Sequence, residues 1–312
     1  WARKQAWPAV YRLAPFWEPW LRPRRADLFH GLNQRLPEAP YPARVVTIHD
    51  LFPLTSRDYS TREFQSRFAA ILRRAIARAD RIIAVSDATR QQLLRHTDAR
   101  DGRIRVVHHG VDPARPVAPA EQEDFRQRVL GLNRQERFFL NVGAVQNRKN
   151  IGNIALALRR LPEFRLVLAG GDGFGAEAIY TLIEKEGLAG RILRLGHAPP
   201  ETLRLLYSTA AALVFPSLEE GFGLPVLEAM SYGLPVITSN CSAMPEVAGD
   251  AALLVDPLDV AALSEAMRRV AEDENLAASL RRRGFERASA FPWEKCASQT
   301  WKVYQEALEE KQ

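Results

Sequence analysis

Short apolar runs alternate with stretches of helical period along most of the chain. In the first third, three apolar runs of strand length are separated by two amphipathic stretches. The predicted strands are Val45–Ile48, Ile82–Val85 and Ile104–Val107, and the predicted helices are Glu63–Ala79 and Asp87–His96. Ser86 directly precedes the second helix, and serine is a residue type that caps helix N-termini.

The alternation becomes more regular in the second half of the chain. Strands are predicted at Phe138–Val142, Arg165–Ala169, Ile192–Leu195, Ala212–Phe215, Pro235–Thr238 and Ala252–Val255. Helices are predicted at Lys149–Leu161, Ala176–Glu186, Pro200–Ser208, Pro225–Tyr232, Ala243–Ala248, Asp259–Asp273, Asn275–Ala290 and Trp293–Lys311. This pattern is typical of a parallel sheet covered on both faces, in which ligands bind beyond the carboxyl ends of the strands.

The segment His108–Pro119 interrupts the pattern, because it holds Gly110, Pro113 and Pro116 and shows no apolar period. We interpret it as the linker between two domains, with His108 and His109 at its entrance. The predicted division is an N-terminal domain over residues 1–112, a second domain over 113–290 and a final helix over 291–312. A chain of 312 residues has room for two such domains.

Composition narrows the class of protein. The chain is 46% hydrophobic and 26% charged, as in globular proteins. Two cysteines do not make a disulfide framework and fit a reducing compartment. No uninterrupted apolar run approaches the length of a membrane span. The net charge of +6 favours anionic partners, but no nucleic-acid-binding signature is present, so we expect no nucleic acid among them.

Tryptophans and basic residues are interleaved over residues 1–26, where Trp1, Trp7, Trp17 and Trp20 lie among arginines. Such a segment can lie on an acidic membrane surface. The alternative is a helix packed on its own domain, and several prolines that break the amphipathic period favour that alternative.

The most informative segment runs from Glu220 to Glu228. Two carboxylates stand eight residues apart around a glycine-flanked turn, and Pro225 suits the first turn of the helix that follows. A helix start opened by glycines offers free N–H groups to an anion, while carboxylates accept hydrogen bonds from hydroxyls. This arrangement suits a diphosphate flanked by hydroxylated groups. The plain alternative is a capped surface helix with two solvated glutamates.

Other candidate residues follow predicted strands. Gly143 permits a tight turn, and Arg148 and Lys149 stand at the next helix start, where they could grip phosphate. His49 and Asp50 follow the strand Val45–Ile48. His30 occupies a similar strand end with weaker support.

A glycine-rich turn after the strand Arg165–Ala169 matches the glycine spacing of a dinucleotide-binding motif. Gly171, Gly173 and Ala176 fit the spacing G-x-G-x-x-A. The acidic residue expected after the next strand is absent, because that strand runs into Gly196 and His197. We therefore disfavour a dinucleotide site.

These motifs together resemble one family. The sequence from Phe215 to Met230, with its E-x7-E spacing, resembles that of the retaining glycosyltransferases of family four. The segments from Gly143 to Asn150 and from Met244 to Ala252 resemble the same family. The resemblance extends from about residue 49 to the C-terminus. It implies an α/β GT-B fold with two Rossmann-like doubly wound domains facing a cleft and a last helix that crosses back to the first domain. No match exists for the family's usual first strand, glycine-rich loop and helix, so we expect the first domain to be incomplete.

The resemblance also implies roles for the candidate residues. Arg148 and Lys149 would hold the donor diphosphate, Glu228 the ribose, and Glu220 the donor sugar near the reacting carbon. The predicted catalytic residues are His49 and Glu220, and the predicted acceptor side consists of His30, His49 and Asp50. The predicted donor site comprises Gly143, Arg148, Lys149, Gly171, His197, Glu220, Gly221, Phe222, Gly223, Leu224 and Glu228.

The function implied is transfer of a hexosyl group from a nucleotide sugar to an acceptor hydroxyl with retention, with no metal or other cofactor. GDP-mannose is the first expectation for the donor and UDP-sugars the second. The acceptor would be a saccharide or lipid-linked saccharide in polysaccharide or O-antigen synthesis, at the cytoplasmic face of the membrane. An inactive nucleotide-sugar-binding scaffold and a sugar-nucleotide epimerase stay open, while a two-carboxylate glycosidase is disfavoured because it needs no phosphate-binding cations.

Overall fold

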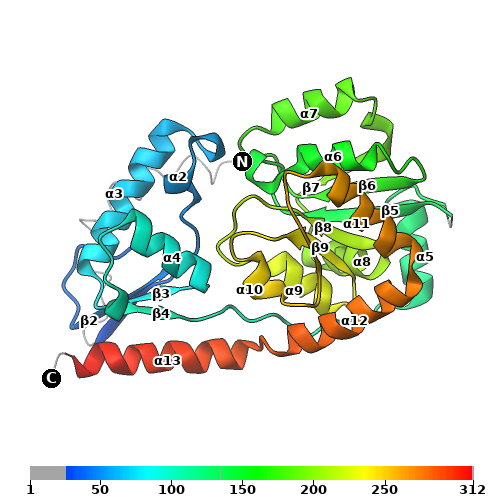
Figure 1. Ribbon diagram of the computed structural model, residues 1–312. Coiled ribbons are helices and arrows are strands. Elements are labelled where there is room, and N and C mark those ends of the chain that lie inside the picture. Colours follow the sequence, from blue (N-terminus) through cyan, green and yellow to red (C-terminus); the bar gives the residue numbers. More distant parts are fainter. Residues whose placement is uncertain (1–25, 134, 311–312) are drawn as a thin grey trace.

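The computed structural model describes residues 26–133 and 135–310, which form two lobes, each built on a parallel sheet (Figure 1). The first lobe contains a sheet with the strand order β1-β2-β3-β4. Its strands are β1 (Leu28–Gly31), β2 (Ala43–Ile48), β3 (Arg81–Ala84) and β4 (Ile104–Val106), joined by α2 (Phe52–Thr55), α3 (Arg62–Arg78) and α4 (Asp87–His96). The tryptophan-rich segment over residues 1–25 lies outside the described residues.

The second lobe contains a six-stranded sheet with the order β10-β9-β8-β5-β6-β7, in which every pair is parallel. Its strands are β5 (Arg137–Val142), β6 (Phe164–Ala169), β7 (Ile192–Gly196), β8 (Ala212–Phe215), β9 (Val236–Ser239) and β10 (Leu253–Val255). Its helices are α5 (Pro119–Arg128), α6 (Ile151–Leu158), α7 (Ala176–Lys185), α8 (Pro200–Thr209), α9 (Leu224–Ser231), α10 (Met244–Ala248), α11 (Val260–Glu272) and α12 (Glu274–Ser289).

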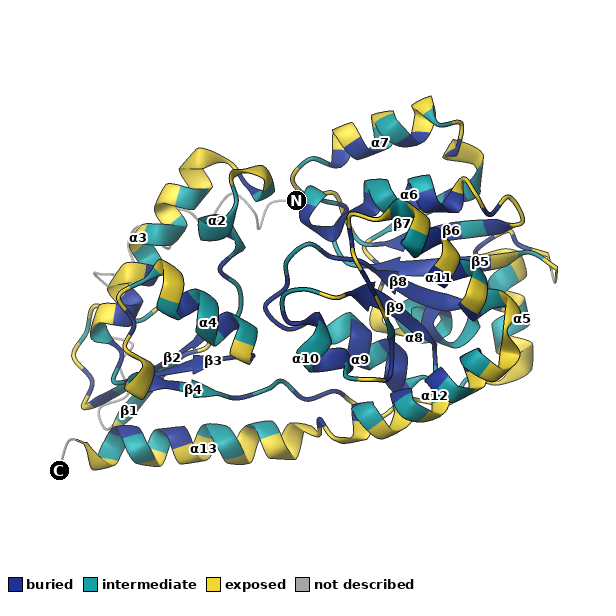
Figure 2. Cartoon of the chain, viewed as in Figure 1, coloured by how far each residue is buried: buried dark blue, intermediate teal, exposed yellow. Residues whose placement is uncertain are grey.

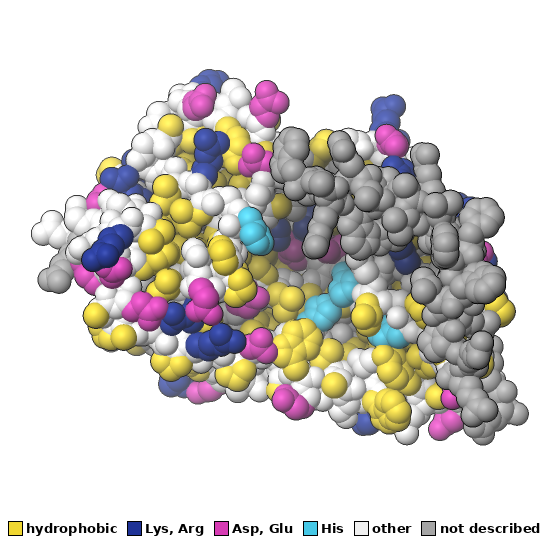
Figure 3. Space-filling model, turned by 180° about the vertical axis from the view of Figure 1, so that it is seen from behind, with side chains coloured by type: hydrophobic (Ala, Val, Ile, Leu, Met, Phe, Trp, Pro, Cys, Tyr) yellow, Lys and Arg dark blue, Asp and Glu magenta, His cyan; other side chains and the backbone are white. Residues whose placement is uncertain are grey.

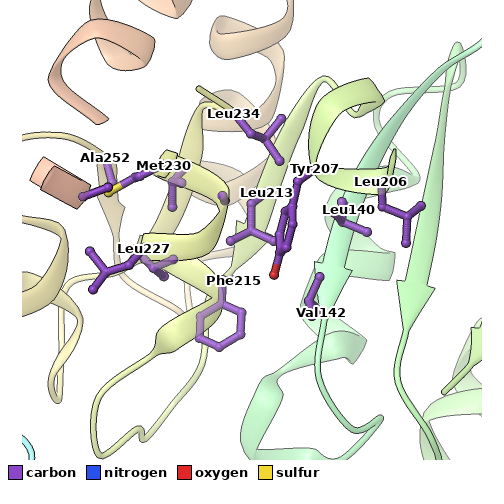
Figure 4. Close-up of a cluster of buried hydrophobic side chains, with 14 of the residues drawn as sticks. Leu140, Val142, Leu206, Tyr207, Leu213, Phe215, Leu227, Met230, Leu234 and Ala252 are labelled. Carbon is purple, nitrogen blue, oxygen red and sulfur yellow. The ribbon is translucent and has the colours of Figure 1, made fainter. Parts of the chain in front are cut away.

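Both faces of the second sheet are covered, and its strands are largely buried (Figure 2). One core packs β5 and β8 against α8 and α9, and Figure 4 shows Leu140, Leu213, Phe215 and Leu227 pointing into it. The other core packs the opposite face of the sheet against α6, α7 and α11. This burial on both faces explains why the strands read as continuous apolar runs in the sequence.

The chain passes between the lobes twice. The first connection follows β4, and the second leads from α12 into α13 (Trp293–Glu309), which runs back beneath the first lobe (Figure 1). The two connections touch, because Val111 N–H donates to the Phe291 carbonyl at 2.9 Å. At Gly110, an added Cβ would lie 2.6 Å from Trp293 Cα, so this close approach needs a glycine.

The alternating pattern predicted most elements to within one or two residues. Ser86 caps α4 as expected and accepts a hydrogen bond from Thr89 N–H at 3.0 Å. The helix α5 was not predicted; among its described residues only Phe125 is buried, so it has no apolar period to detect. The predicted helix from Lys149 is wrong at its start, because Asn150 is left-handed (φ 58°) and α6 begins only at Ile151.

Candidate functional site

A short 3₁₀ turn after β5 places two cations at the carboxyl end of the second sheet. The turn is Asn147–Lys149, and the left-handed Asn150 closes it. Asn150 Nδ2 donates to the carbonyls of Pro216 at 3.2 Å and Pro257 at 2.6 Å, which anchors the turn to the loops after β8 and β10. Arg148 and Lys149 therefore point inward, and both side chains are buried.

Glu220 lies against both cations. Its Oε1 atom is 2.5 Å from Lys149 Nζ and 2.9 Å from Arg148 Nη1, and the residue is only 7% exposed. Burial opposes ionisation of this carboxyl, but the charges of Lys149 and Arg148 outweigh burial and lower the pKa of Glu220. The three side chains therefore form a buried cluster of ions at the end of the sheet.

The cluster leaves part of one cation without a partner. Arg148 Nε is buried and has no hydrogen-bond partner among the described residues. The Arg148 guanidinium lies 4.7 Å from the centre of the Phe52 ring, and Lys149 Nζ lies 4.4 Å from that of Phe215. Two cations that converge on one carboxylate oxygen can accept a further anion such as a phosphate.

Two glycines make room for this cluster. Gly143 has φ 129°, and an added Cβ would lie 3.2 Å from Lys149 Cε. Gly170, which was not predicted, packs so closely that an added Cβ would lie 1.9 Å from the Gly143 carbonyl oxygen. At the predicted Gly171 an added Cβ would meet no atom within 4 Å, so the packing requirement falls on its neighbour.

Glu228 lies away from the cluster, on the second turn of α9. Its Oε2 atom accepts a hydrogen bond of 2.6 Å from the buried Tyr207 hydroxyl. Both residues line a cavity of about 740 Å³ between α8, α9 and the linker, as do Leu203 and Leu224. This volume lies within the range of pockets for small ligands.

The start of α9 is formed as the glycines predict, one residue earlier than expected. Gly223 has φ 100° and stands at the N-cap, so the helix begins at Leu224. The predicted Phe222 side chain is buried among rings, 5.2 Å from His109 and 6.0 Å from Phe291 between centres. His197 follows β7 and is exposed.

On the first lobe, His49 is held by protein groups at both ring nitrogens. Its Nδ1 atom lies 3.1 Å from His109 Nε2, and its Nε2 atom lies 2.7 Å from the Leu32 carbonyl. The two imidazole rings are stacked with centres 5.1 Å apart. Burial, together with His49 and His108, lowers the pKa of His109 to about 4, which keeps that ring neutral. Seen from behind, histidine side chains gather around a hollow in the middle of the molecule (Figure 3).

His30 is also engaged at both ring nitrogens, by side chains of α13 and β2, and its predicted place on the acceptor side stays a prediction. Its ring bonds the Tyr304 hydroxyl at 2.7 Å and the Thr47 hydroxyl at 2.8 Å. Burial, with a smaller contribution from His49, lowers the pKa of His30 to about 4. Through these two hydrogen bonds, His30 links α13 to strand β2 of the first sheet.

The lobes meet at the loop that carries Glu220. Gly221 N–H donates to Asp50 Oδ1 at 2.9 Å, so this predicted donor-site group and this predicted acceptor-side group bond each other. The Gly221 carbonyl accepts hydrogen bonds from Ser86 at 2.6 Å and Thr89 at 3.1 Å. The structure thus places the Asp50 side chain and the His49 carbonyl next to Gly221, which directly follows Glu220.

Two acidic residues at the same interface were not predicted as site residues. Glu246 accepts hydrogen bonds from the N–H groups of Asp87 and Ala88 and lies 2.7 Å from His108 Nε2. Glu219 accepts from Gln92 at 3.0 Å and from Thr55. The signal available for Glu246 was its place in the Met244–Ala252 resemblance; Glu219 differs in no visible way from any surface glutamate.

Two kinds of feature are absent from residues 26–133 and 135–310. No group of three or more His, Cys, Asp or Glu side chains there is arranged to hold a metal ion. In the same residues, every helix is too short or too polar to cross a bilayer.

The sequence matches two family models and is similar to known proteins. The model described as glycosyl transferases group 1 matches residues 122–287, and that of glycosyltransferase family 4 matches residues 2–115. The chain is 34% identical over 303 residues to the O-antigen chain mannosyltransferase B of Escherichia coli. That alignment covers 95% of this chain and 79% of the relative.

Solved structures give the same arrangement of lobes. Sucrose-phosphate synthase from Thermosynechococcus elongatus superposes with a TM-score of 0.80 at 25% identity, covering 97% of this chain and 79% of that one. Anabaena HepE in complex with UDP and glucose superposes with a TM-score of 0.77 at 19% identity, covering 96% and 82%. These likenesses confirm the expected GT-B fold.

Proposed function

The chain belongs to the glycosyl transferases group 1 family, and we propose that it transfers a mannosyl group from GDP-mannose to a saccharide hydroxyl with retention at the anomeric carbon. The observation that carries this proposal is the buried cluster of Arg148, Lys149 and Glu220. Glu228, which follows Glu220 by eight residues in the sequence, lines the cavity described above. The choice of mannose is supported by the likeness to an O-antigen chain mannosyltransferase. The name of that relative also supports a growing polysaccharide as the acceptor.

In this proposal, Arg148 and Lys149 bind the diphosphate and stabilise its charge as the sugar–oxygen bond breaks. No metal ion is included, since two cations already face the leaving group. Glu228, oriented by Tyr207, accepts hydrogen bonds from the ribose hydroxyls. Glu220 turns its free oxygen to the hydroxyls of the sugar.

Retention is proposed without a covalent intermediate. Glu220 is paired with two cations, which makes it a weak nucleophile, and Glu228 bonds Tyr207. The acceptor oxygen would attack from the face that the diphosphate leaves, and the departing phosphate oxygen would take the acceptor proton. His49 lies at the opposite wall of the site and would contact the sugar or the acceptor. A position at the cytoplasmic face of a membrane stays a prediction.

A nucleotide-sugar-binding protein without turnover is a second candidate. The observation that favours it is the engagement of both His49 nitrogens by His109 and Leu32. Turnover distinguishes the two candidates, because a transferase releases free GDP from GDP-mannose and a scaffold does not.

Calorimetry with GDP, UDP, ADP and their common sugars tests the donor site. We expect the GDP series to bind, and Lys149→Ala to weaken binding about tenfold or more, because a charge-assisted hydrogen bond is lost. Glu228→Ala should weaken the binding of nucleotides and leave the binding of inorganic pyrophosphate unchanged. Lys185→Ala, at an exposed lysine on α7, is the control. Equal affinity of Lys149→Ala and Lys185→Ala for the preferred nucleotide would contradict the assigned site.

A further inference from the structure

The peptide of Gly221 is held from the opposite lobe by buried hydroxyl groups. Ser86 and Thr89, on the cap and first turn of α4, both donate to its carbonyl oxygen, and both residues are 0% exposed. Asp50, after β2, accepts from its N–H. The fit admits only glycine, because an added Cβ would lie 1.6 Å from the His49 carbonyl oxygen. All hydrogen-bonding groups of this one peptide residue are therefore satisfied by the first lobe.

We propose that Ser86 and Thr89 are positioning residues, which set the place of Glu220 relative to the donor sugar and do so only when the two lobes are closed. The inference rests on the proposed function, since the sugar is the target assigned to Glu220. Neither residue contacts the ion cluster. They act through the backbone of Gly221, which follows Glu220 directly in the chain.

The loop is gripped on both sides of the Glu220 side chain. From its own lobe, Ser242 donates to the Glu220 carbonyl at 2.8 Å and accepts from Glu220 N–H at 3.0 Å. From the first lobe, the α4 hydroxyls fix the next carbonyl. Two fixed peptide units leave the Glu220 side chain little freedom beyond its own rotamers, and reactions are sensitive to small displacements of such groups.

This arrangement separates two parts of donor recognition. The groups assigned to nucleotide binding, Arg148, Lys149 and Glu228, all belong to the second lobe. The contact between Glu220 and the sugar depends in addition on α4. Loss of the α4 hydroxyl should therefore leave the affinity for GDP unchanged and lower the affinity for GDP-mannose.

The test compares two variants of Thr89. Thr89→Val removes the hydroxyl group and keeps the side-chain volume, whereas Thr89→Ser keeps a hydroxyl group. Thr97→Val is the matched control, because Thr97 closes the same helix and its hydroxyl bonds a carbonyl of that helix, Leu93, at 2.7 Å. Calorimetry measures the dissociation constants of GDP and GDP-mannose for each variant. Hydrogen–deuterium exchange measures opening of the loop over residues 217–224 in the protein without ligand.

We expect Thr89→Val to reduce the ratio of the GDP to the GDP-mannose dissociation constant about three- to tenfold, as for one lost hydrogen bond, with GDP affinity unchanged. Loop exchange should become faster, and Thr89→Ser should restore both values. Unchanged exchange in Thr89→Val would overturn the inference. So would faster exchange with an unchanged ratio. Failure of the wild type to bind any nucleotide contradicts the proposed function instead, and the exchange result still decides whether the hydroxyls hold the loop.

Discussion

The two walls of the site use different chemistry. The second lobe contributes buried ions, with Arg148 and Lys149 on one oxygen of Glu220. The first lobe contributes hydroxyl groups and histidines that bond one another, and burial keeps His30 and His109 neutral. A wall with incompletely paired cations is prepared for an anion before the anion arrives. A wall of hydroxyl groups and neutral rings, together with the Asp50 carboxyl group that accepts from Gly221 N–H, is suited to holding the opposite lobe. We therefore assign affinity for the nucleotide to the second lobe alone. Placement of the reacting groups is assigned to the two lobes in contact with each other.

The variant Gly221→Ala tests the different roles of the two walls most directly. The new methyl group would meet the His49 carbonyl at 1.6 Å, so the lobes cannot keep their present contact. We expect the protein to fold and to bind GDP normally, while its radius of gyration by small-angle scattering increases and turnover of GDP-mannose falls about a hundredfold or more, as expected when reacting groups are misplaced.

Gly190→Ala is the control for that experiment, because an added Cβ there meets no atom within 4 Å. Normal turnover in Gly221→Ala would show that the contact between the lobes is not needed for the reaction.

The two walls should lose their contribution to stability in different ranges of pH. The pKa values of His30 and His109 fall from 6.5 to about 4 on folding. Between these values the unfolded chain binds more protons, so the free energy of unfolding should decrease as pH falls from 6.5 to 4. After allowance for solvent screening, we expect a loss of about 1–2 kcal/mol.

The pKa of Glu220 is also lowered on folding, from an ordinary value of 4.5, so its contribution is present above pH 4.5 and is lost only at more acidic pH. Urea unfolding at pH 7, 5.5 and 4.5 measures the histidine range, over which the contribution of Glu220 stays constant. The variant His109→Gln should flatten that part of the profile. A wild-type profile that is flat from pH 7 to 4.5 would contradict the neutral first-lobe wall.

A weaker effect is predicted for a hydrogen bond that orients Glu228 within the second lobe. Tyr207→Phe removes the hydroxyl that donates to Glu228 at 2.6 Å. We expect GDP affinity to fall about threefold, as for one neutral-to-charged hydrogen bond that water partly replaces, and pyrophosphate affinity to stay constant. Tyr232→Phe is the control on the same ring stack. Equal losses for GDP and pyrophosphate would mean that Tyr207 supports the cation cluster and not the nucleoside end.

The sequence predicted the second wall better than the first, for a physical reason. Arg148, Lys149 and Glu220 each belong to a short local motif after a strand, and parallel strands bring such motifs to one edge of the sheet. The bonds of Thr89 and Ser86 to Gly221 join residues more than 130 positions apart, and nothing local marks them. The turn at Asn150 escaped prediction because a left-handed asparagine looks like any helical asparagine in a sequence.

Steric detail escaped prediction as well. The G-x-G-x-x-A spacing selects Gly171, because Asp172 stands two residues after Gly170, yet it is Gly170 that lies against Gly143 in the fold. His109 was predicted at the linker entrance, but its stacking on His49 joins residues 60 positions apart, and nothing local in the sequence marks it. Periodicity therefore gave the layers and the strand ends, whereas contacts between lobes required the folded chain.

The pair of adjoining connections between the lobes has a mechanical consequence. Two rigid bodies joined at one flexible point can rotate in three directions. Here the lobes are joined by two connections, which are hydrogen-bonded to each other from Val111 to Phe291. Together with the long helix packed beneath the first lobe, these connections should suppress twisting and sliding. We expect the remaining motion to be a bending rotation about the line through the two connections. We therefore expect closure of the lobes to return the Gly221 peptide to the same hydroxyls along the same arc.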